Sequence, residues 1–413
     1  MKKVSVVHLE RGMYVAKLDR PWTETGFREP FVLQGFTIES DKDLQTVKSA
    51  CRFVYIDPSR GRDTKFHIDD VKDSSLWSDT TAENLLSADL PPPAYEDRIK
   101  AEDEQKVARE IRQDTGKVFN TLIKRTEAGR SINIEIVRKT VTKLVESVIR
   151  NPDALIWLTK MKHGDSYSYT HSMTICVLAL AVGRHLGIPQ SQLNVLGTAA
   201  LLQDVGKTRL PALMVKKPSK YTEQEYELSK MHVGASVGLL RDKTGASEAV
   251  LDIVAEHHER FDGSGYPRGL RGNTIGMLST ISGMVDTYAA MTSLRPYRTT
   301  MTSFESLMRM YDMRNKQFPA AIVEHFIQCI GIFSIGSFVQ LDTHEVGIIV
   351  ARNRIKQLTP RVMVVLDSEG NRAKNLITID LAKQQLEEGR ELRQIVKVVN
   401  PEDYNLDPAE FFA

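Results

Sequence analysis

An almost unbroken helical pattern runs through the middle of the 413-residue chain, over residues 97–330. Within it, apolar residues recur at the three- and four-residue spacing of amphipathic helices, as at Ile134, Val137, Val141 and Leu144. Helices with such apolar stripes pack together as a bundle, so the pattern predicts an all-α central domain.

Two capping boxes mark the starts of later helices in this region. Thr222 precedes Glu225 by three residues, and Thr302 precedes Glu305 in the same way. In such a pair each side chain can bind a backbone N–H group that the first helical turn leaves without a partner. The sequence therefore predicts a helix beginning after each threonine.

The segments on either side of the helical region have a different character. Residues 1–66 contain short β-prone runs separated by turn residues, with one helix expected over residues 40–50, and they predict a small β-rich N-terminal domain. Residues 67–96 are acidic and include three consecutive prolines, which predicts a linker. Residues 331–413 alternate like strands and predict a small C-terminal β-module. The predicted protein is multidomain and mainly α.

Composition excludes several classes of partner. The formal net charge is only +2, which gives no bulk electrostatic reason to bind a nucleic acid polymer or a membrane surface. The three cysteines lie far apart in the sequence, as expected in a reducing compartment. The longest uninterrupted apolar run covers residues 175–182, well short of the roughly 20 residues of a membrane-spanning helix. The N-terminus lacks the pattern of a signal peptide, so we expect a cytoplasmic protein without a membrane span.

The residues that could carry chemistry all lie in or beside predicted helices of the central region. In chain order they are His171, Asp204, Lys207, His232, His257, His258 and Asp286. His171 is expected to open an apolar helix over residues 173–186. Each of these histidines taken alone is more often structural than a ligand, but helices of a bundle can turn such side chains into one core site.

This set of side chains indicates a metal site. Imidazole nitrogens together with carboxylates suit first-row metals such as iron, manganese, nickel or zinc. Several histidines and two carboxylates exceed what one metal needs, and they suit two ions that share a carboxylate and hold a hydroxide between them for attack on a phosphoryl group. Lys207 and Arg295 could stabilise the negative charge on the phosphate oxygens.

Residues 155–298 resemble the HD-GYP family, a branch of the HD phosphohydrolases. The matching elements are Asp165-x-Tyr167 with His171-Ser172, Gln203-Asp204-Val205-Gly206-Lys207, the turn Lys216-Lys217-Pro218, His232, His257-His258-Glu259-Arg260, the loop Asp262-Gly263-Ser264-Gly265-Tyr266-Pro267, and Asp286 ahead of Arg295-Pro296-Tyr297-Arg298. The N-terminal segment is similar to a domain often found before HD-GYP. The resemblance implies an HD-type helical bundle and a cytoplasmic bacterial phosphodiesterase that hydrolyses cyclic di-GMP to pGpG and often on to GMP. It also implies iron or manganese as the usual metal.

The resemblance further implies two groups of metal ligands that share Asp204. The first group is His171, Gln203, Asp204 and Asp286, and the second is Asp204, His232, His257 and His258. The family is named for a His-Asp pair, whereas this chain has Gln203 before Asp204. Because an amide oxygen is usually a weaker ligand than imidazole, we expect the first metal to be loosely held, different in identity, or absent.

Three interpretations of the function stay open on the sequence. Retained hydrolysis of cyclic di-GMP is favoured, because every other ligand type is present. Gln203 favours an alternative in which a degenerate site binds cyclic di-GMP or a protein partner without turnover. A third interpretation is a phosphodiesterase for another cyclic dinucleotide, such as the mixed guanine–adenine one.

The remaining predictions concern substrate contacts and the flanking segments. Asp204 and Lys207 are the predicted catalytic residues, and Lys207, Arg295 and Tyr297 are predicted to contact the substrate. The loop at Gly265-Tyr266 is expected to shape the rim of the nucleotide pocket. The helical stretch over residues 97–125 could pack on the bundle or pair with a second copy of the chain. A sensing or signalling-partner role for the N-terminal domain follows only from its position.

Overall fold

The structure is a computed structural model, and it describes residues 2–6, 9–18, 35–51, 53–62, 95–131, 133–160, 167–215, 217, 219–293, 301–331, 333–353, 358–384, 393–406 and 408–411. Nearly all of the predicted linker and the β-prone run over residues 30–33 lie outside these ranges. By their internal contacts, residues 91–329 with 335–338 and 398–413 form one compact unit, and the remaining residues form a second. The predicted domain boundaries stay a prediction.

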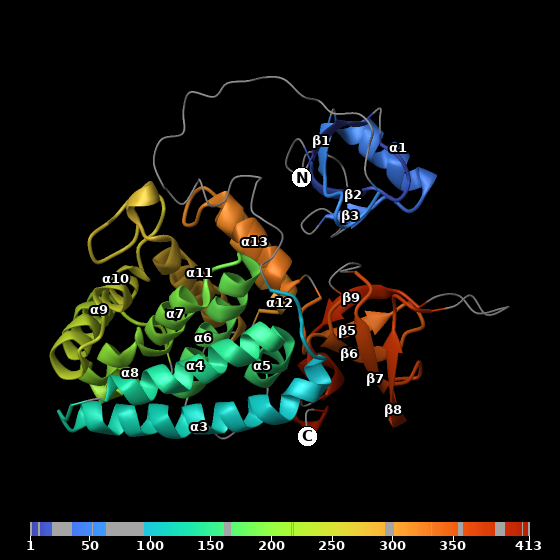
Figure 1. Cartoon of the computed structure of the whole chain (residues 1–413). Coiled ribbons are helices and arrows are strands. Elements are labelled where there is room, and N and C mark those ends of the chain that lie inside the picture. The colour runs from blue at the N-terminus through green and yellow to red at the C-terminus, as the bar shows by residue number, and fades with distance from the viewer. Residues whose placement is uncertain are drawn as a thin grey trace. The chain divides into compact units, whose positions relative to one another are not determined.

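The N-terminal segment folds as a small antiparallel sheet with one helix (Figure 1). The strands, in spatial order, are β1 (Lys2–Ser5), β4 (Phe53–Ile56), β2 (Tyr14–Leu18) and β3 (Phe36–Thr37). The helix α1 (Asp41–Ala50) begins after Ser40, whose side chain accepts a hydrogen bond from the N–H of Asp43 in a complete capping box. This confirms the helix expected over residues 40–50.

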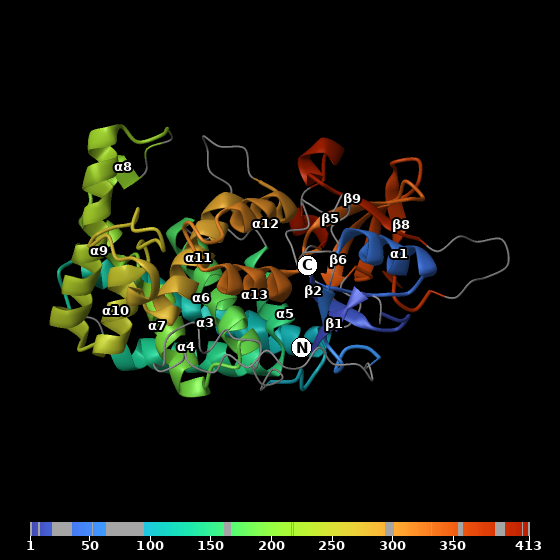
Figure 2. The same ribbon diagram turned by 90° about the horizontal axis from the view of Figure 1, so that it is seen from above.

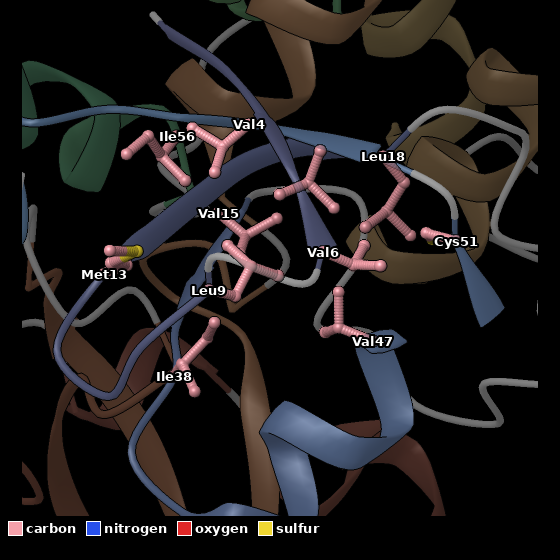
Figure 3. Close-up of a cluster of buried hydrophobic side chains, with 11 residues drawn as sticks. Val4, Val6, Leu9, Met13, Val15, Leu18, Ile38, Val47, Cys51 and Ile56 are labelled. Atoms are coloured by element: carbon pink, nitrogen blue, oxygen red, sulfur yellow. The ribbon is translucent and has the colours of Figure 1, made fainter. Parts of the chain in front are cut away.

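The core of this small domain is purely apolar (Figure 3). Val4 and Val54 face each other across β1 and β4, and Ile38 and Val47 close the core from the α1 side. All four side chains are at most 1% exposed. Cys51 contributes one thiol to this cluster of described residues, which contains no histidine or carboxylate and so offers no group of metal ligands.

The helical unit contains most of the secondary structure of the chain (Figures 1 and 2). Its elements are α3 (Ala101–Glu127), α4 (Ile134–Arg150), α5 (Pro152–Thr159), α6 (Tyr167–His185), α7 (Gln190–Leu202), η4 (Val205–Arg209), α8 (Ala212–Val215), α9 (Glu223–Thr244), α10 (Glu248–Glu256), η5 (Gly272–Thr274), α11 (Met277–Thr292), α12 (Ser303–Asp312) and α13 (Ala320–Ile330). Both predicted capping boxes are present, at the starts of α9 and α12.

Helix α6 forms the centre of the unit, where α4, α5, α7 and α11 pack around it. The apolar run over residues 175–182 is at most 2% exposed on every side, which explains why it lacks an amphipathic pattern. Each fully buried Leu, Val or Ile stabilises the fold by roughly 1.5–3 kcal/mol relative to exposure. The central helix is therefore a firm support for any side chain at its ends.

The prediction that His171 opens its helix is wrong, because α6 begins four residues earlier at Tyr167. The extension has a tertiary cause. Tyr169 is buried, its hydroxyl donates to the carbonyl of Arg112 at 2.6 Å, and its ring packs against Phe119 with 5.6 Å between ring centroids. Contacts with α3 thus hold the first turn of α6 in a polar and aromatic stretch that has little helical pattern of its own.

The helix α3 packs its apolar face on α4 and α5, as the first of the two predicted alternatives expected. Glu104, near its start, is 1% exposed and accepts hydrogen bonds from Ser147 and Arg150 of α4 at 2.7–2.9 Å. Because this buried carboxylate is fully paired, it fixes α3 on α4 rather than offering a site.

The C-terminal segment forms a five-stranded antiparallel sheet in the order β8, β7, β6, β5, β9. The strands are β5 (Phe338–Leu341), β6 (Val346–Ala351), β7 (Arg361–Leu366), β8 (Arg372–Asp380) and β9 (Ile395–Val399). The sheet confirms the predicted β-module but adds β8, an edge strand whose side chains are largely exposed and therefore lack the alternating apolar pattern. Within the described ranges, no helix has the length and apolarity needed to cross a membrane.

Candidate metal centre

Five helices of the helical unit bring the predicted ligands to one place. The ligand positions are His171 on α6, Asp204 between α7 and η4, His232 on α9, His257 and His258 directly after α10, and Asp286 on α11. The ligand atoms of Asp204, His232, His257 and His258 all lie within 4.8 Å of one another. The same is true of His171, Asp204 and Asp286. Asp204 belongs to both groups, as the predicted bridging carboxylate should.

The two oxygens of Asp204 face different partners. Its Oδ1 lies 3.3 Å from Nε2 of His232 and 4.0 Å from Nε2 of His257. Its Oδ2 lies 2.7 Å from Nζ of Lys207 and 3.9 Å from Nε2 of His171. One carboxylate therefore connects the two groups of ligand atoms.

Asp286 completes the group on the side of His171. Its Oδ1 lies 3.0 Å from Nε2 of His171, and its Oδ2 lies 3.9 Å from Nδ1 of His258. The predicted ligands therefore form one continuous cluster in which neighbouring nitrogen and oxygen atoms are spaced closely enough to share cations.

The hydrogen bonds of His232 and His257 fix which ring nitrogen faces the cluster. Nδ1 of His232 donates to the carbonyl of Ser229 at 2.6 Å, and Nδ1 of His257 donates to the carbonyl of Val254 at 2.7 Å. A carbonyl can only accept, so Nδ1 carries the proton in each neutral ring and Nε2 carries a lone pair. Both Nε2 atoms are buried and have no hydrogen-bond partner among the described residues. A buried lone pair without a partner is costly, and a metal ion would satisfy it.

Burial and charge set the protonation states that a cation needs. Burial lowers the pKa of His257 to about 4 and holds the pKa of His258 well below its usual value, so both rings are neutral at pH 7. Burial alone would raise the pKa of Asp204, but the positive charge of Lys207 is the largest opposing influence, and the pKa is held well below its usual range. Asp286 behaves in the same way, with His171 as the opposing partner. Neutral imidazoles beside ionised carboxylates fit a pair of first-row divalent ions.

The loop after His258 folds back onto the cluster. The ring of Tyr266 stacks on His258 with 4.6 Å between centroids and 28° between planes. Glu259 is 3% exposed and accepts hydrogen bonds from the backbone N–H groups of Arg268 and Leu270 at 2.7 and 2.9 Å. The loop that contains Gly265 and Tyr266 is thus held over the histidine pair.

Close backbone contacts also depend on two glycines. A Cβ atom at Gly206 would lie 2.2 Å from the carbonyl oxygen of His232, so only glycine lets η4 approach α9 this closely. A Cβ atom at Gly283 of α11 would lie 2.2 Å from the carbonyl oxygen of His257. Arg260 reinforces the second approach, because it donates to the carbonyl of His257 at 3.1 Å and to Thr287 of α11 at 3.3 Å.

Comparison with known proteins identifies the family. Residues 153–322 match the family model of the HD domain. The chain is 31% identical over 365 residues to the cyclic di-GMP phosphodiesterase PA4108 of Pseudomonas aeruginosa, a match that covers 88% of this chain and 85% of that protein. The chain belongs to the HD-GYP family. Residues 1–137 also match a domain of unknown function, DUF3391, and residues 338–407 match a KOW domain associated with the HD domain.

Other relatives match a smaller share of the chain. The cyclic di-GMP phosphodiesterase response regulator RpfG of Xanthomonas campestris is 30% identical over 46% of this chain and 47% of that protein. The 3'3'-cGAMP-specific phosphodiesterase 1 of Vibrio cholerae is 35% identical over 33% of this chain and 31% of that protein. Among solved structures, the HD-GYP protein Bd1817 of Bdellovibrio bacteriovorus is 18% identical, with a TM-score of 0.47 over 78% of this chain and 97% of that one.

The side chain of Gln203 lies in the wall of the HD-GYP centre. It is 1% exposed, and its Oε1 accepts a hydrogen bond from Oγ of Ser282 at 2.6 Å, while its Nε2 is buried with no partner among the described residues. Ser282 lies one helical turn before Asp286, so the amide is next to the first ligand group. The oxygen that was predicted to bind metal is therefore already engaged, and ligation by Gln203 stays a prediction.

The structure also shows supporting residues of the HD-GYP centre that the sequence did not reveal. Ser236 donates to the carbonyl of Gln203 at 2.7 Å and accepts from the N–H of Gly206 at 2.8 Å, which ties α9 to the turn that carries Asp204. Serines are common on helices, so neither Ser236 nor Ser282 gave a signal. The predicted substrate contacts Arg295 and Tyr297 lie outside the described residues, as do Asp165 and Lys216.

Proposed function

We propose that this chain is a metal-dependent phosphodiesterase that hydrolyses cyclic di-GMP to pGpG or onward to GMP. The observation that carries the proposal is the convergence of four imidazoles and two carboxylates in one cluster, in which His257 and His258 are neutral and Asp204 is ionised at pH 7. The name of the P. aeruginosa relative, which matches most of both chains, supports the choice of substrate.

Two metal ions, iron or manganese, are the proposed cofactors. One would be held by His171, Asp204 and Asp286, and the other by Asp204, His232, His257 and His258. Two divalent ions at such a site activate a water molecule and stabilise charge on a phosphoryl group. No nucleophile from the protein is required.

The residues of the chain itself then position the substrate phosphate. Lys207 is held by Asp204 at 2.7 Å, yet its side chain is 42% exposed. Its ammonium group can therefore contact a phosphate oxygen while it stays beside the bridging carboxylate, and it stabilises the charge that builds up there. Asp204 is ionised and acts as the shared ligand, and the loop at Tyr266 borders the same space.

Two alternatives keep specific support. The V. cholerae relative named for 3'3'-cGAMP favours a mixed cyclic dinucleotide as substrate. The hydrogen bond between Ser282 and Gln203 favours a degenerate site that binds without turnover, because it engages the amide oxygen. Homodimerisation and a signalling-protein partner stay predictions.

One assay separates these functions. Protein loaded with iron(II) or manganese(II) is incubated with cyclic di-GMP or with 3'3'-cGAMP, and pGpG, GMP and the mixed linear products are followed by chromatography. We expect pGpG from cyclic di-GMP, and no product from chelator-treated protein or from the Asp204→Asn variant. Measurable binding of cyclic di-GMP without product, with either metal, would favour the degenerate site instead.

A further inference from the structure

Exposed apolar side chains concentrate in one stretch of the helical unit. Of the eleven large apolar side chains that are exposed in the described part of the chain, six lie between residues 213 and 231. They are Leu213, Val215, Tyr221, Tyr226, Leu228 and Met231. A concentration of exposed apolar side chains commonly marks a place where a ligand binds.

Tyr226 is connected to the centre through one lysine. Nζ of Lys230 lies 4.9 Å from the centroid of the Tyr226 ring and 5.5 Å from that of Tyr266, both within the range of a cation–π contact. Tyr266 in turn stacks on His258, one of the candidate ligands. A continuous series of contacts therefore runs from the metal centre through Tyr266 and Lys230 to Tyr226.

The helix α9 sets this arrangement. Tyr226 and Lys230 are four residues apart and so share one face of the helix. Glu227 accepts a hydrogen bond from Nζ of Lys230 at 2.6 Å, which holds the ammonium group between the two rings. His232, two residues further along the same helix, directs its Nε2 into the cluster. One helix thus carries both the candidate ligand His232 and an aromatic platform, which is the ring of Tyr226 with Lys230 beside it.

We propose that Tyr226 and Lys230 bind one guanine base of the cyclic dinucleotide. The inference rests on the proposed function and names the base-recognition residues of that site. Tyr226 is 48% exposed, so much of its ring is open for a base to stack on. In a cyclic dinucleotide one sugar joins each base to the phosphates, so a phosphate held at the metal centre would keep a base close to it. Guanine presents two acceptors, O6 and N7, that an ammonium group can bind, whereas adenine replaces O6 by an amino donor. Lys230 therefore favours guanine over adenine.

The test measures binding and turnover by metal-loaded protein with four variants. Tyr226→Ala removes the ring, Tyr226→Phe keeps it, and Lys230→Met removes the charge but keeps much of the side-chain length. Leu228→Ala is the matched control, because Leu228 lies on the same helix and is 38% exposed. Equilibrium dialysis gives the Kd for cyclic di-GMP and for cyclic di-AMP. Hydrolysis of bis(p-nitrophenyl) phosphate, which has no purine, reports on the metal centre alone.

We expect Tyr226→Ala to weaken binding of cyclic di-GMP by about 10-fold or more, the loss typical of one stacked base, while Tyr226→Phe and Leu228→Ala stay near wild type. Lys230→Met should reduce the preference for cyclic di-GMP over cyclic di-AMP. Hydrolysis of bis(p-nitrophenyl) phosphate, metal content and thermal midpoint should be the same in all four variants as in the wild type.

The outcomes separate this inference from the proposed function. If the wild type binds cyclic di-GMP without turnover, the proposed hydrolysis fails while the binding series still tests the platform. If Tyr226→Ala binds as tightly as Leu228→Ala, the platform is wrong even when hydrolysis is seen. A wild-type protein that binds no cyclic dinucleotide overturns both proposals.

Discussion

The hydroxyl of Ser282 donates a hydrogen bond to the side-chain oxygen of Gln203 at 2.6 Å. This contact links the end of α7 to α11 at the point where the first ligand group meets the bundle core. It also fixes the side-chain oxygen of Gln203, the residue that replaces the histidine of the family's His-Asp pair. We expect the departure to affect one side of the centre only, because Oδ1 of Asp204 faces His232 and His257 on the other side.

Replacing Gln203 by histidine should strengthen metal binding at the group formed by His171, Asp204 and Asp286. An imidazole would add a stronger ligand than an amide whose oxygen is already engaged by Ser282. We expect the Gln203→His variant to retain more metal per chain after dialysis, and its turnover of cyclic di-GMP should rise. Metal content by mass spectrometry is the first measurement. An unchanged metal content would show that position 203 does not control the first site.

Replacing Asp204 by asparagine should remove the ligand that both groups share. The amide keeps the size of the carboxylate but loses its charge, and Oδ1 and Oδ2 both face other candidate ligands. Loss of a supporting partner outside the ligand set typically lowers metal affinity or activity by about 10- to 100-fold, and a shared ligand should exceed that. Metal content and phosphodiesterase rate are measured together. Asp262→Asn, in an exposed part of the loop, serves as the control, and equal rates in the two variants would contradict the bridging role.

Metal-free protein should lose stability as the pH falls from about 6.5 to about 4. Burial lowers the pKa of His257 from 6.5 to about 4, so in this window the unfolded chain takes up a proton that the folded chain does not. At 1.36 kcal/mol per pH unit, His257 alone accounts for up to about 3 kcal/mol of the free energy of unfolding. Asp204 and Asp286 act at lower pH, because their pKa values are lowered from 3.8.

Urea unfolding of chelator-treated protein at several pH values between 7 and 4 measures this dependence. The His257→Asn variant removes the titrating group and should show a shallower slope over the same range. A wild-type free energy of unfolding that is constant from pH 7 to pH 5 would be incompatible with a buried, neutral His257.

Replacing Glu259 by glutamine should loosen the loop that covers the histidine pair. The buried carboxylate accepts from two backbone N–H groups, of Arg268 and Leu270, whereas an amide offers only one oxygen. Hydrogen bonds to a charged group contribute roughly 1.5–3 kcal/mol, so the variant should unfold more easily by about that amount. Denaturant unfolding measures the change. Metal content should fall less than in Asp204→Asn, since Glu259 touches the loop rather than the ligand atoms.

The site was predictable from sequence to the extent that its chemistry is carried by rare residue types. Histidines and aspartates such as His257 and Asp204 are conspicuous beside apolar helical runs in the sequence. The structure brings the four histidines and two aspartates predicted as ligands into one cluster, namely His171, Asp204, His232, His257, His258 and Asp286. The capping boxes at Thr222 and Thr302 could also be predicted from the sequence, because each is a pair of residues within one helical turn.

What the sequence could not show depends on contacts between distant elements. The start of α6 is fixed by Tyr169 against α3, and no local pattern encodes that packing. Ser282 and Ser236 matter only because α11 and α9 pass the end of α7. The importance of Tyr226 likewise depends on the return of the loop that carries Tyr266 to Lys230.

The close contact between Gly206 and the carbonyl of His232 means that any substitution of Gly206 would disturb the candidate metal centre. Since a Cβ atom there would lie 2.2 Å from that oxygen, even a single methyl group would act as a wedge between η4 and α9. The wedge would drive Asp204 and His232 apart, although neither residue had been changed. The separation of the candidate ligands Asp204 and His232 therefore depends on the absence of a side chain at Gly206, which is not itself a candidate ligand.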